Sequence, residues 1–173
     1  DVPAEPTYDA VVVVGVLEYV GEGAADPAPY VAFLERLAAV LVPGGTLALA
    51  IENKLGVKYV VGAPEDHTDV VFDSVEDYPA GAPVRTFSRA ELEDLVRAAG
   101  LEPTVHVAFP DYKVTRAVMD VPALYRHAPR LLADLPNFPS PDLRSRRPHL
   151  ADEGRVWHSL ADAGLAADFG NSF

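Results

Sequence analysis

The spacing of apolar positions changes several times along the chain. Residues 10–14 form a continuous run of Ala and Val, typical of a strand covered on both faces in a parallel sheet. From Tyr30 to Leu41 the apolar side chains recur every three or four residues, as on the buried side of a helix. A second apolar run, 46–51, follows a Pro-Gly-Gly turn at 43–45. Strand, helix and strand in this order predict a βαβ unit with parallel strands.

A second long helix is marked at both of its ends. Ser88 is the expected N-cap, Glu91 completes a capping box three residues later, and Gly100 suits the position just beyond the last turn. Residues 104–109 follow as a third strand, whose alternation of apolar and polar residues places it nearer a sheet edge. Together these elements predict half of a doubly wound α/β sheet.

The character of the chain changes after Met119. Residues 121–135 and 152–164 have helical patterns and flank a proline-rich loop. We therefore divide the chain into an α/β unit, residues 1–119, and a helical cap or insertion, residues 120–173.

Composition limits the classes of protein to which the chain can belong. Of its 173 residues, 49% are hydrophobic and 23% charged, which is typical of one globular domain. Its 14 Lys and Arg against 26 Asp and Glu give a net charge of -12, which disfavours binding to nucleic acid. The absence of cysteine fits a reducing cytoplasm. The apolar runs are shorter than the roughly 20 residues of a membrane span, so none is expected.

The chain begins at Asp1 and its single methionine is Met119, so we expect it to be a piece of a longer protein. The first strand should then expose an edge that further strands would pair with, and bare edges invite association. We expect either a homodimer that closes this edge or association with the missing domain segments.

Polar residues follow each predicted strand, where open α/β sheets bind their ligands. These residues lie in three segments, 15–19, 52–53 and 110–113. Because parallel strands end at the same edge of a sheet, Glu18 and Glu52 are expected to lie near one another. Acids in this position border a crevice where solvent or a ligand can satisfy them.

The stretches YDAVVVVGVLEYV (8–20) and LVPGGTLALAIEN (41–53) resemble the second half of a class I S-adenosylmethionine-dependent methyltransferase. In that family a Phe/Tyr-Asp pair opens one strand and a Pro-Gly-Gly turn introduces the next. The runs IENKLGVKYVVGAPEDHTD, RTFSRAELEDLVRAAGLE and FPDYK are similar to a subgroup associated with glycosyltransferases and surface polysaccharide biosynthesis. The resemblance covers residues 7–119. It implies a partial Rossmann-like methyltransferase sheet of three main strands with flanking helices, followed by a proline-rich helical C-terminal segment.

The resemblance implies O-methylation of a saccharide or other small hydroxyl substrate by the parent protein. The turn after the first strand would contact the methionine part of the cofactor through Gly15, Val16 and Leu17. Residues at the ends of the other two strands are expected to bind substrate: Glu52, Asn53, Asp111, Tyr112 and Lys113.

Two cofactor-binding parts of that family are not in this chain, namely the glycine-rich loop after the first strand and the acid at the end of the second. The one Gly-x-Gly, at 21–23, follows a different strand and is interpreted as a loop. S-adenosylmethionine is therefore expected to bind this piece weakly or not at all. The family's last strand, which inserts antiparallel beside the sixth, is expected to be cut off at Phe173.

His67 is the expected general base, because an imidazole with a pKa near 6.5 can accept a hydroxyl proton at neutral pH. Glu65 or Asp66 could orient its ring, and Glu18 is the second catalytic candidate. A metal site formed by Glu65, Asp66, His67 and Asp69 is an alternative, but clustered loop carboxylates are more often solvated. No metal is therefore expected.

Two other functions stay open. The missing cofactor loop would also suit a non-catalytic α/β interaction module. A different Rossmann-like enzyme is a third reading, against which the Pro-Gly-Gly turn argues. A basic cluster either binds an anionic sugar nucleotide or balances the acidic chain, and we favour the latter: Arg144, Arg146, Arg147 and His149.

Overall fold

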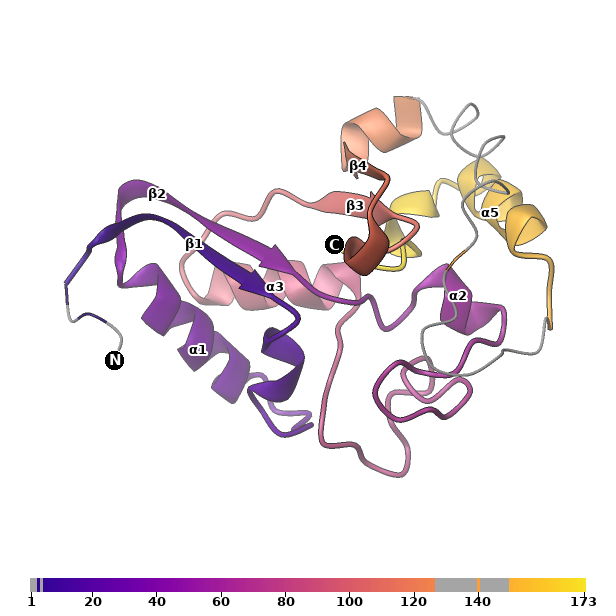
Figure 1. Ribbon diagram of the computed structural model, residues 1–173, viewed down its shortest axis with the longest axis horizontal. Coiled ribbons are helices and arrows are strands. Elements are labelled where there is room, and N and C mark those ends of the chain that lie inside the picture. The colour runs from indigo at the N-terminus through magenta and orange to yellow at the C-terminus, as the bar shows by residue number, and fades with distance from the viewer. Residues whose placement is uncertain (1–2, 4, 127–139, 141–149) are drawn as a thin grey trace.

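The computed structural model describes residues 3, 5–126, 140 and 150–173, which form a mixed α/β architecture (Figure 1). Strands β1 (Tyr8–Val14) and β2 (Leu41–Ala50) are parallel, and β3 (His106–Phe109) and β4 (Ala117–Asp120) are antiparallel. The helices are α1 (Ala28–Ala38), α2 (Val57–Val60), α3 (Arg89–Ala98) and α5 (Glu153–Asp162). In the part of the chain that the structure describes, no helix has the length and apolar character needed to cross a membrane.

The predicted βαβ unit is confirmed, with α1 connecting β1 to β2. The Pro-Gly-Gly turn, however, lies inside β2 and not before it. The register moves from Tyr8 paired with Leu41 to Ala10 paired with Thr46, and Gly44 between them takes a φ of +81°. A residue without a side chain adopts this conformation at little cost, so the turn becomes an irregularity within a longer strand.

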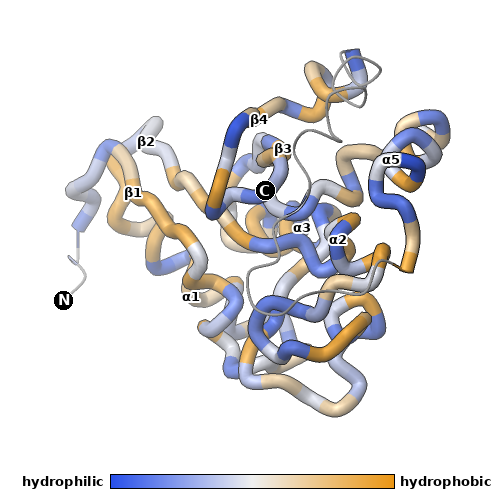
Figure 2. Tube along the Cα trace, turned by 45° about the vertical axis from the view of Figure 1, so that its right-hand side comes forward, coloured by the Kyte–Doolittle hydropathy of each residue, from blue (hydrophilic) through white to orange (hydrophobic). Residues whose placement is uncertain are grey.

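Among the described residues, side chains cover only one face of the β1–β2 pair. Val13 is buried, and Leu47 and Leu49 pack against the hydrophobic core that α1 and α3 contribute to. On the opposite face Val12 and Val14 are 69% and 52% exposed. The tube of β1 is coloured as largely hydrophobic in Figure 2. The prediction of a first strand covered on both faces is therefore wrong for this chain. Among the described residues β1 pairs with β2 alone, so its outer edge is bare, and the expected association through that edge stays a prediction.

Helix α3 begins and ends as its sequence predicts. The Ser88 hydroxyl accepts a hydrogen bond from the backbone of Glu91, whose carboxylate accepts one from the backbone of Ser88. Gly100 takes a φ of +78° and donates to the carbonyl of Arg97, and Leu101 donates to Val96. These two bonds are a Schellman ending, which satisfies carbonyls that the helix itself leaves open.

The C-terminal residues join the two strand pairs. Ile51 and Phe173 exchange two backbone hydrogen bonds of 3.1 Å, and residues 171–173 run antiparallel to 51–53. On the other side Ala108 of β3 donates to the carbonyl of Ser172. The C-terminus thus lies between the end of β2 and β3 (Figure 1). The three predicted strands are therefore divided between two pairs that this short segment links. β1 pairs with β2, and β3 pairs with β4, a strand that the sequence did not predict.

The helical C-terminal part is partly described. Helix α5 is confirmed and begins at the N-cap Asp152, whose side chain accepts from the backbone of Arg155. Residues 121–126 are helical, and the rest of that predicted helix lies outside the described residues. The proline-rich loop from Pro141 and the basic cluster at 144–149 also lie outside them.

The capping box gives a direct test of how α3 is stabilised. Ser88→Ala removes the side-chain acceptor for the Glu91 amide, and we expect the free energy of unfolding to fall by about 1 kcal/mol. Urea denaturation followed by circular dichroism measures the change. Ser159→Ala, the same substitution at an exposed position inside α5, is the matched control and should change stability by less than about 0.5 kcal/mol. Equal effects of the two substitutions would contradict the capping role.

Candidate functional site

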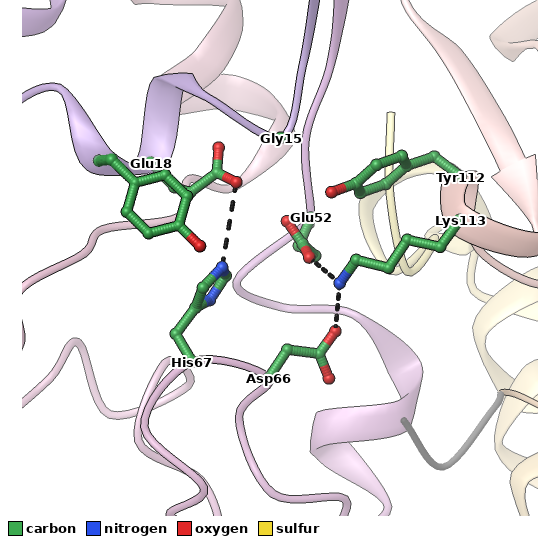
Figure 3. A pocket seen from close by; sticks show the side chains of 8 residues that line it. Gly15, Glu18, Glu52, Asp66, His67, Tyr112 and Lys113 are labelled. Atoms are coloured by element: carbon green, nitrogen blue, oxygen red, sulfur yellow. Dashed lines mark hydrogen bonds and ion pairs between the residues drawn. The ribbon is translucent and has the colours of Figure 1, made fainter. Parts of the chain in front are cut away.

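A pocket of about 350 Å³ lies beyond the carboxyl ends of β1 and β2 (Figure 3). Four separate parts of the chain meet there, from the turn after β1, the end of β2, the loop after α2 and the turn after β3. The lining residues are Gly15, Glu18, Tyr19, Glu52, Asp66, His67, Tyr112 and Lys113. The expectation that Glu18 and Glu52 lie together at this edge agrees with the structure.

The turn after β1 needs glycine at position 15. Gly15 has a φ of +61°, and a Cβ added there would lie 2.8 Å from the hydroxyl oxygen of Tyr112. Its backbone then enters the short 3-10 helix η1 (Leu17–Tyr19). Leu17 is buried in the core and Val16 is 43% exposed, and neither lines the pocket. Of the three residues predicted to contact the cofactor, only Gly15 is in place to touch a ligand here.

Glu18 and Glu52 are buried and incompletely hydrogen-bonded. Their exposed fractions are 1% and 0%, and within the described part of the chain the Oε2 atom of each has no hydrogen-bond partner. Both carboxylates point into the pocket (Figure 3). Burial, with the nearby charge of Glu52, raises the pKa of Glu18 despite opposing contributions from its backbone hydrogen bond and from His67. Two buried carboxylates that repel one another favour the binding of a proton or a cation between them.

His67 is held from one side by Glu65. The Glu65 carboxylate accepts from the backbone amides of His67 and Thr68, both at 2.7 Å, and lies 2.8 Å from Nδ1 of the imidazole. An ionised carboxylate only accepts, so Nδ1 is the donor. Nε2 then faces the pocket, 3.9 Å from Oε1 of Glu18, and the ring of Tyr19 packs edge-on at 5.5 Å. The residue that orients the ring is therefore Glu65.

The charges around His67 also change its pKa. Burial by itself lowers the pKa, but the hydrogen bond and charge of Glu65, together with Glu52 and Glu18, raise it above the ordinary value. The pKa of Glu65 is lowered. Burial of this carboxyl acts to raise its pKa, but the contacts with His67 and Thr68 have the larger, opposite effect. His67 and Glu65 therefore behave as a charge-assisted pair.

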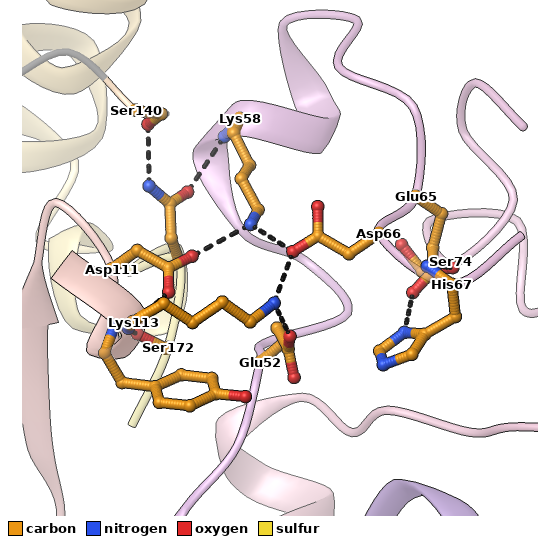
Figure 4. A network of polar contacts seen from close by, with 12 residues as sticks. Glu52, Lys58, Glu65, Asp66, His67, Ser74, Asp111, Lys113, Ser140 and Ser172 are labelled. Carbon is orange, nitrogen blue, oxygen red and sulfur yellow. Dashed lines mark hydrogen bonds and ion pairs between the residues drawn. The ribbon is translucent and has the colours of Figure 1, made fainter. Parts of the chain in front are cut away.

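An alternating row of charges supports the pocket (Figure 4). Lys113 bridges Glu52 and Asp66, and Lys58 bridges Asp66 and Asp111 with two contacts of 2.9 Å. The two lysines together outweigh burial and hold the pKa of Asp66 below its usual range. The ion pairs likewise outweigh burial and raise the pKa of Lys113. Lys58 is only 1% exposed and was not predicted to be part of the site. A lysine inside the apolar run 57–61 is the sequence signal that could have indicated a buried ion pair.

Two residues predicted to bind substrate, Asn53 and Asp111, instead form hydrogen bonds with other parts of the chain next to the pocket. The Asn53 amide donates to the carbonyls of Asp168 and Gly170 at 2.8 and 2.7 Å, while its oxygen accepts from the backbone of Leu55. Asp111 accepts from Lys58 and from the backbone of Lys113. Neither residue lines the pocket, whereas Tyr112 and Lys113 do, from the 3-10 helix η2 (Tyr112–Val114).

The loop carboxylates that the sequence suggested as metal ligands have other partners in the structure. The Glu65 carboxylate accepts hydrogen bonds from His67 and Thr68, and the Asp66 carboxylate forms ion pairs with Lys58 and Lys113. The structure instead brings one oxygen each of Glu18 and Glu52 and one nitrogen of His67 within 4.8 Å of one another. Two carboxylates and an imidazole can exchange a proton with a ligand or hold a cation.

No family model, curated protein or solved structure matches this chain. The geometry of the pocket is therefore the basis for proposing a function.

The role of Asn53 as a structural side chain can be tested by two substitutions. Asn53→Ala leaves two carbonyls and one amide without their partner, and we expect it to lower the free energy of unfolding by about 2–3 kcal/mol. Asn53→Asp keeps an acceptor for Leu55 but loses both donated bonds, so it should destabilise by at least as much. Chemical denaturation measures both. An Asp variant as stable as the native protein would contradict this assignment.

Proposed function

We propose that the parent protein is a cytoplasmic enzyme that transfers a methyl group from S-adenosylmethionine to a hydroxyl of a saccharide or another small substrate. The observation that carries this proposal is the convergence of polar side chains beyond the carboxyl ends of two parallel strands, where α/β enzymes bind their ligands. The acceptor would occupy the pocket between Glu18, His67 and Tyr112.

The chemistry of the pocket suits an acceptor with several hydroxyl groups. Its volume of about 350 Å³ is at the small end of ligand sites and is adequate for a sugar ring. Methyl transfer is a single displacement, so it needs alignment of the acceptor and removal of its proton. Glu18 and His67, facing one another across 3.9 Å, form the pair to which we assign proton removal. Tyr112 and Lys113 are placed to hold other hydroxyls.

The strand arrangement supports the same proposal. The order β1, β2, residues 171–173 and β3, with 171–173 antiparallel, is compatible with a methyltransferase sheet whose last strand inserts beside the sixth. We therefore propose a partial Rossmann-like sheet, with β3 as the sixth strand. The bare edge of β1 is where the strands that carry the cofactor loop would pair.

Cofactor binding tests the enzyme class. Isothermal titration of S-adenosylhomocysteine is expected to show saturable binding to the full-length gene product and at least about hundredfold weaker binding to residues 1–173, because the glycine-rich loop is absent from this part. Failure of the full-length product to bind would overturn the methyltransferase proposal and favour a non-catalytic interaction module.

The proton-removing pair is tested in the full-length product with a methyl acceptor that it turns over. His67→Ala and Glu18→Gln are each expected to lower kcat by about a hundredfold or more, the usual contribution of general acid–base catalysis. His106→Ala, at an exposed histidine of β3, is the matched control and should leave kcat unchanged. Full activity of the His67 variant would remove it from the mechanism.

A further inference from the structure

We infer that Glu18, Glu52 and His67 form a binding site for one divalent metal cation. They come from the turn after β1, the end of β2 and the loop after α2, and their donor atoms lie within 4.8 Å of one another. The donor set of two carboxylates and one imidazole suits a first-row cation such as Mn²⁺ or Zn²⁺. This site differs from the loop cluster around Asp69 that the sequence suggested.

The strongest indication is the state of the two carboxylates. Glu18 and Glu52 are almost completely buried, yet Oε2 of each lacks a hydrogen-bond partner among the described residues. An unsatisfied buried oxygen costs about 1–3 kcal/mol, and more when it is charged. Both carboxylates point to the same space in Figure 3. A cation placed there would satisfy both groups at once.

The imidazole is arranged as metal-binding histidines usually are. Its Nδ1 donates to the buried carboxylate of Glu65 at 2.8 Å, which fixes the tautomer and directs Nε2 toward the two glutamates. Such a carboxylate–histidine pair orients the ring and increases the basicity of the nitrogen that faces the metal. Glu65 itself is 1% exposed and is held by two backbone amides, so its position is fixed.

The local charge leaves room for a cation. Five carboxylates gather around the pocket and its support, against the ammonium groups of Lys58 and Lys113 and the imidazole of His67. The carboxylates are Glu18, Glu52, Glu65, Asp66 and Asp111. Lys113 contacts Glu52 through Oε1 and leaves Oε2 directed to the pocket. A divalent cation would offset the remaining negative charge.

Only a small contraction is needed to coordinate an ion. Ligand atoms about 2.1 Å from a metal lie about 3–4 Å apart, so the three side chains would move inward by about 1 Å. Gly15 and Tyr112 also line the pocket, and the remaining coordination positions of the ion could accept ligand hydroxyls. That last step rests on the proposed function: with a cation bound, Glu18 and His67 would hold the ion, and the ion would make a coordinated acceptor hydroxyl easier to deprotonate. Binding of the cation does not depend on it.

Calorimetric titration of the full-length gene product with MnCl₂ tests the site directly, after treatment with EDTA and in about 150 mM salt, which screens weak binding to the acidic surface. We expect one Mn²⁺ per chain, with affinity lowered at least about tenfold by Glu18→Gln, Glu52→Gln or His67→Ala. Glu35→Gln, which removes the same charge from the exposed side of α1, is the control and should bind as the native protein does. Lys113→Met should bind more tightly, because it releases Glu52.

Thermal unfolding separates loss of the site from loss of the fold. Without metal, Glu18→Gln should unfold at the native temperature or above, because it removes the charge of a buried carboxylate whose Oε2 has no hydrogen-bond partner among the described residues. Mn²⁺ should raise the midpoint of the native protein and of Glu35→Gln, but not that of Glu18→Gln. The inference is overturned if the native protein shows no saturable binding, or if Glu18→Gln and Glu52→Gln bind as tightly as Glu35→Gln. Because the readout is binding, a failed methyltransferase assay leaves the result interpretable.

Discussion

The pocket depends on a row of alternating charges, in which three residues are buried and Lys113 reaches solvent. The row runs through Glu52, Lys113, Asp66, Lys58 and Asp111. Taking the charges of Glu52, Lys58 and Asp111 out of water costs several kcal/mol each, and only a close partner of opposite sign offsets that cost. The five residues come from the end of β2, α2, the loop after it and the turn after β3. The ion pairs therefore tie these segments to one another, and three members of the row, Glu52, Asp66 and Lys113, line the pocket.

The two lysines of this row do not pair with every carboxylate oxygen of the pocket. Lys113 occupies one oxygen of Glu52, and the other oxygen faces Glu18 and His67 with no hydrogen-bond partner in the described residues. A protein that buried these acids for stability alone would be expected to pair both oxygens. Incomplete pairing of buried acids that line a polar pocket instead suits a site that receives a proton or a cation from a ligand or from solvent. This feature is common to both functional proposals.

Local signals accounted for much of the fold. The capping box and Gly100 of α3, the helical spacing of α1 and the βαβ order each depend on neighbouring residues, and the structure has all of them. The strand β4 is only four residues long and carries little periodic signal, so it was missed. The exposure of Val12 also could not be predicted, because a β-branched run is the same whether or not a second layer covers it.

The sequence by itself determined that acids end two parallel strands and that Glu18 and Glu52 meet at one edge, because strand polarity follows from the order of elements. Only the tertiary structure decided what each polar side chain does there. In the folded chain the Asn53 amide donates to carbonyls of the C-terminal segment, and a ring nitrogen of His67 lies close to the carboxylates of Glu18 and Glu52. The physical reason is that a hydrogen bond or ion pair depends on distance in space, and the partners of Asn53 lie more than a hundred residues away along the chain.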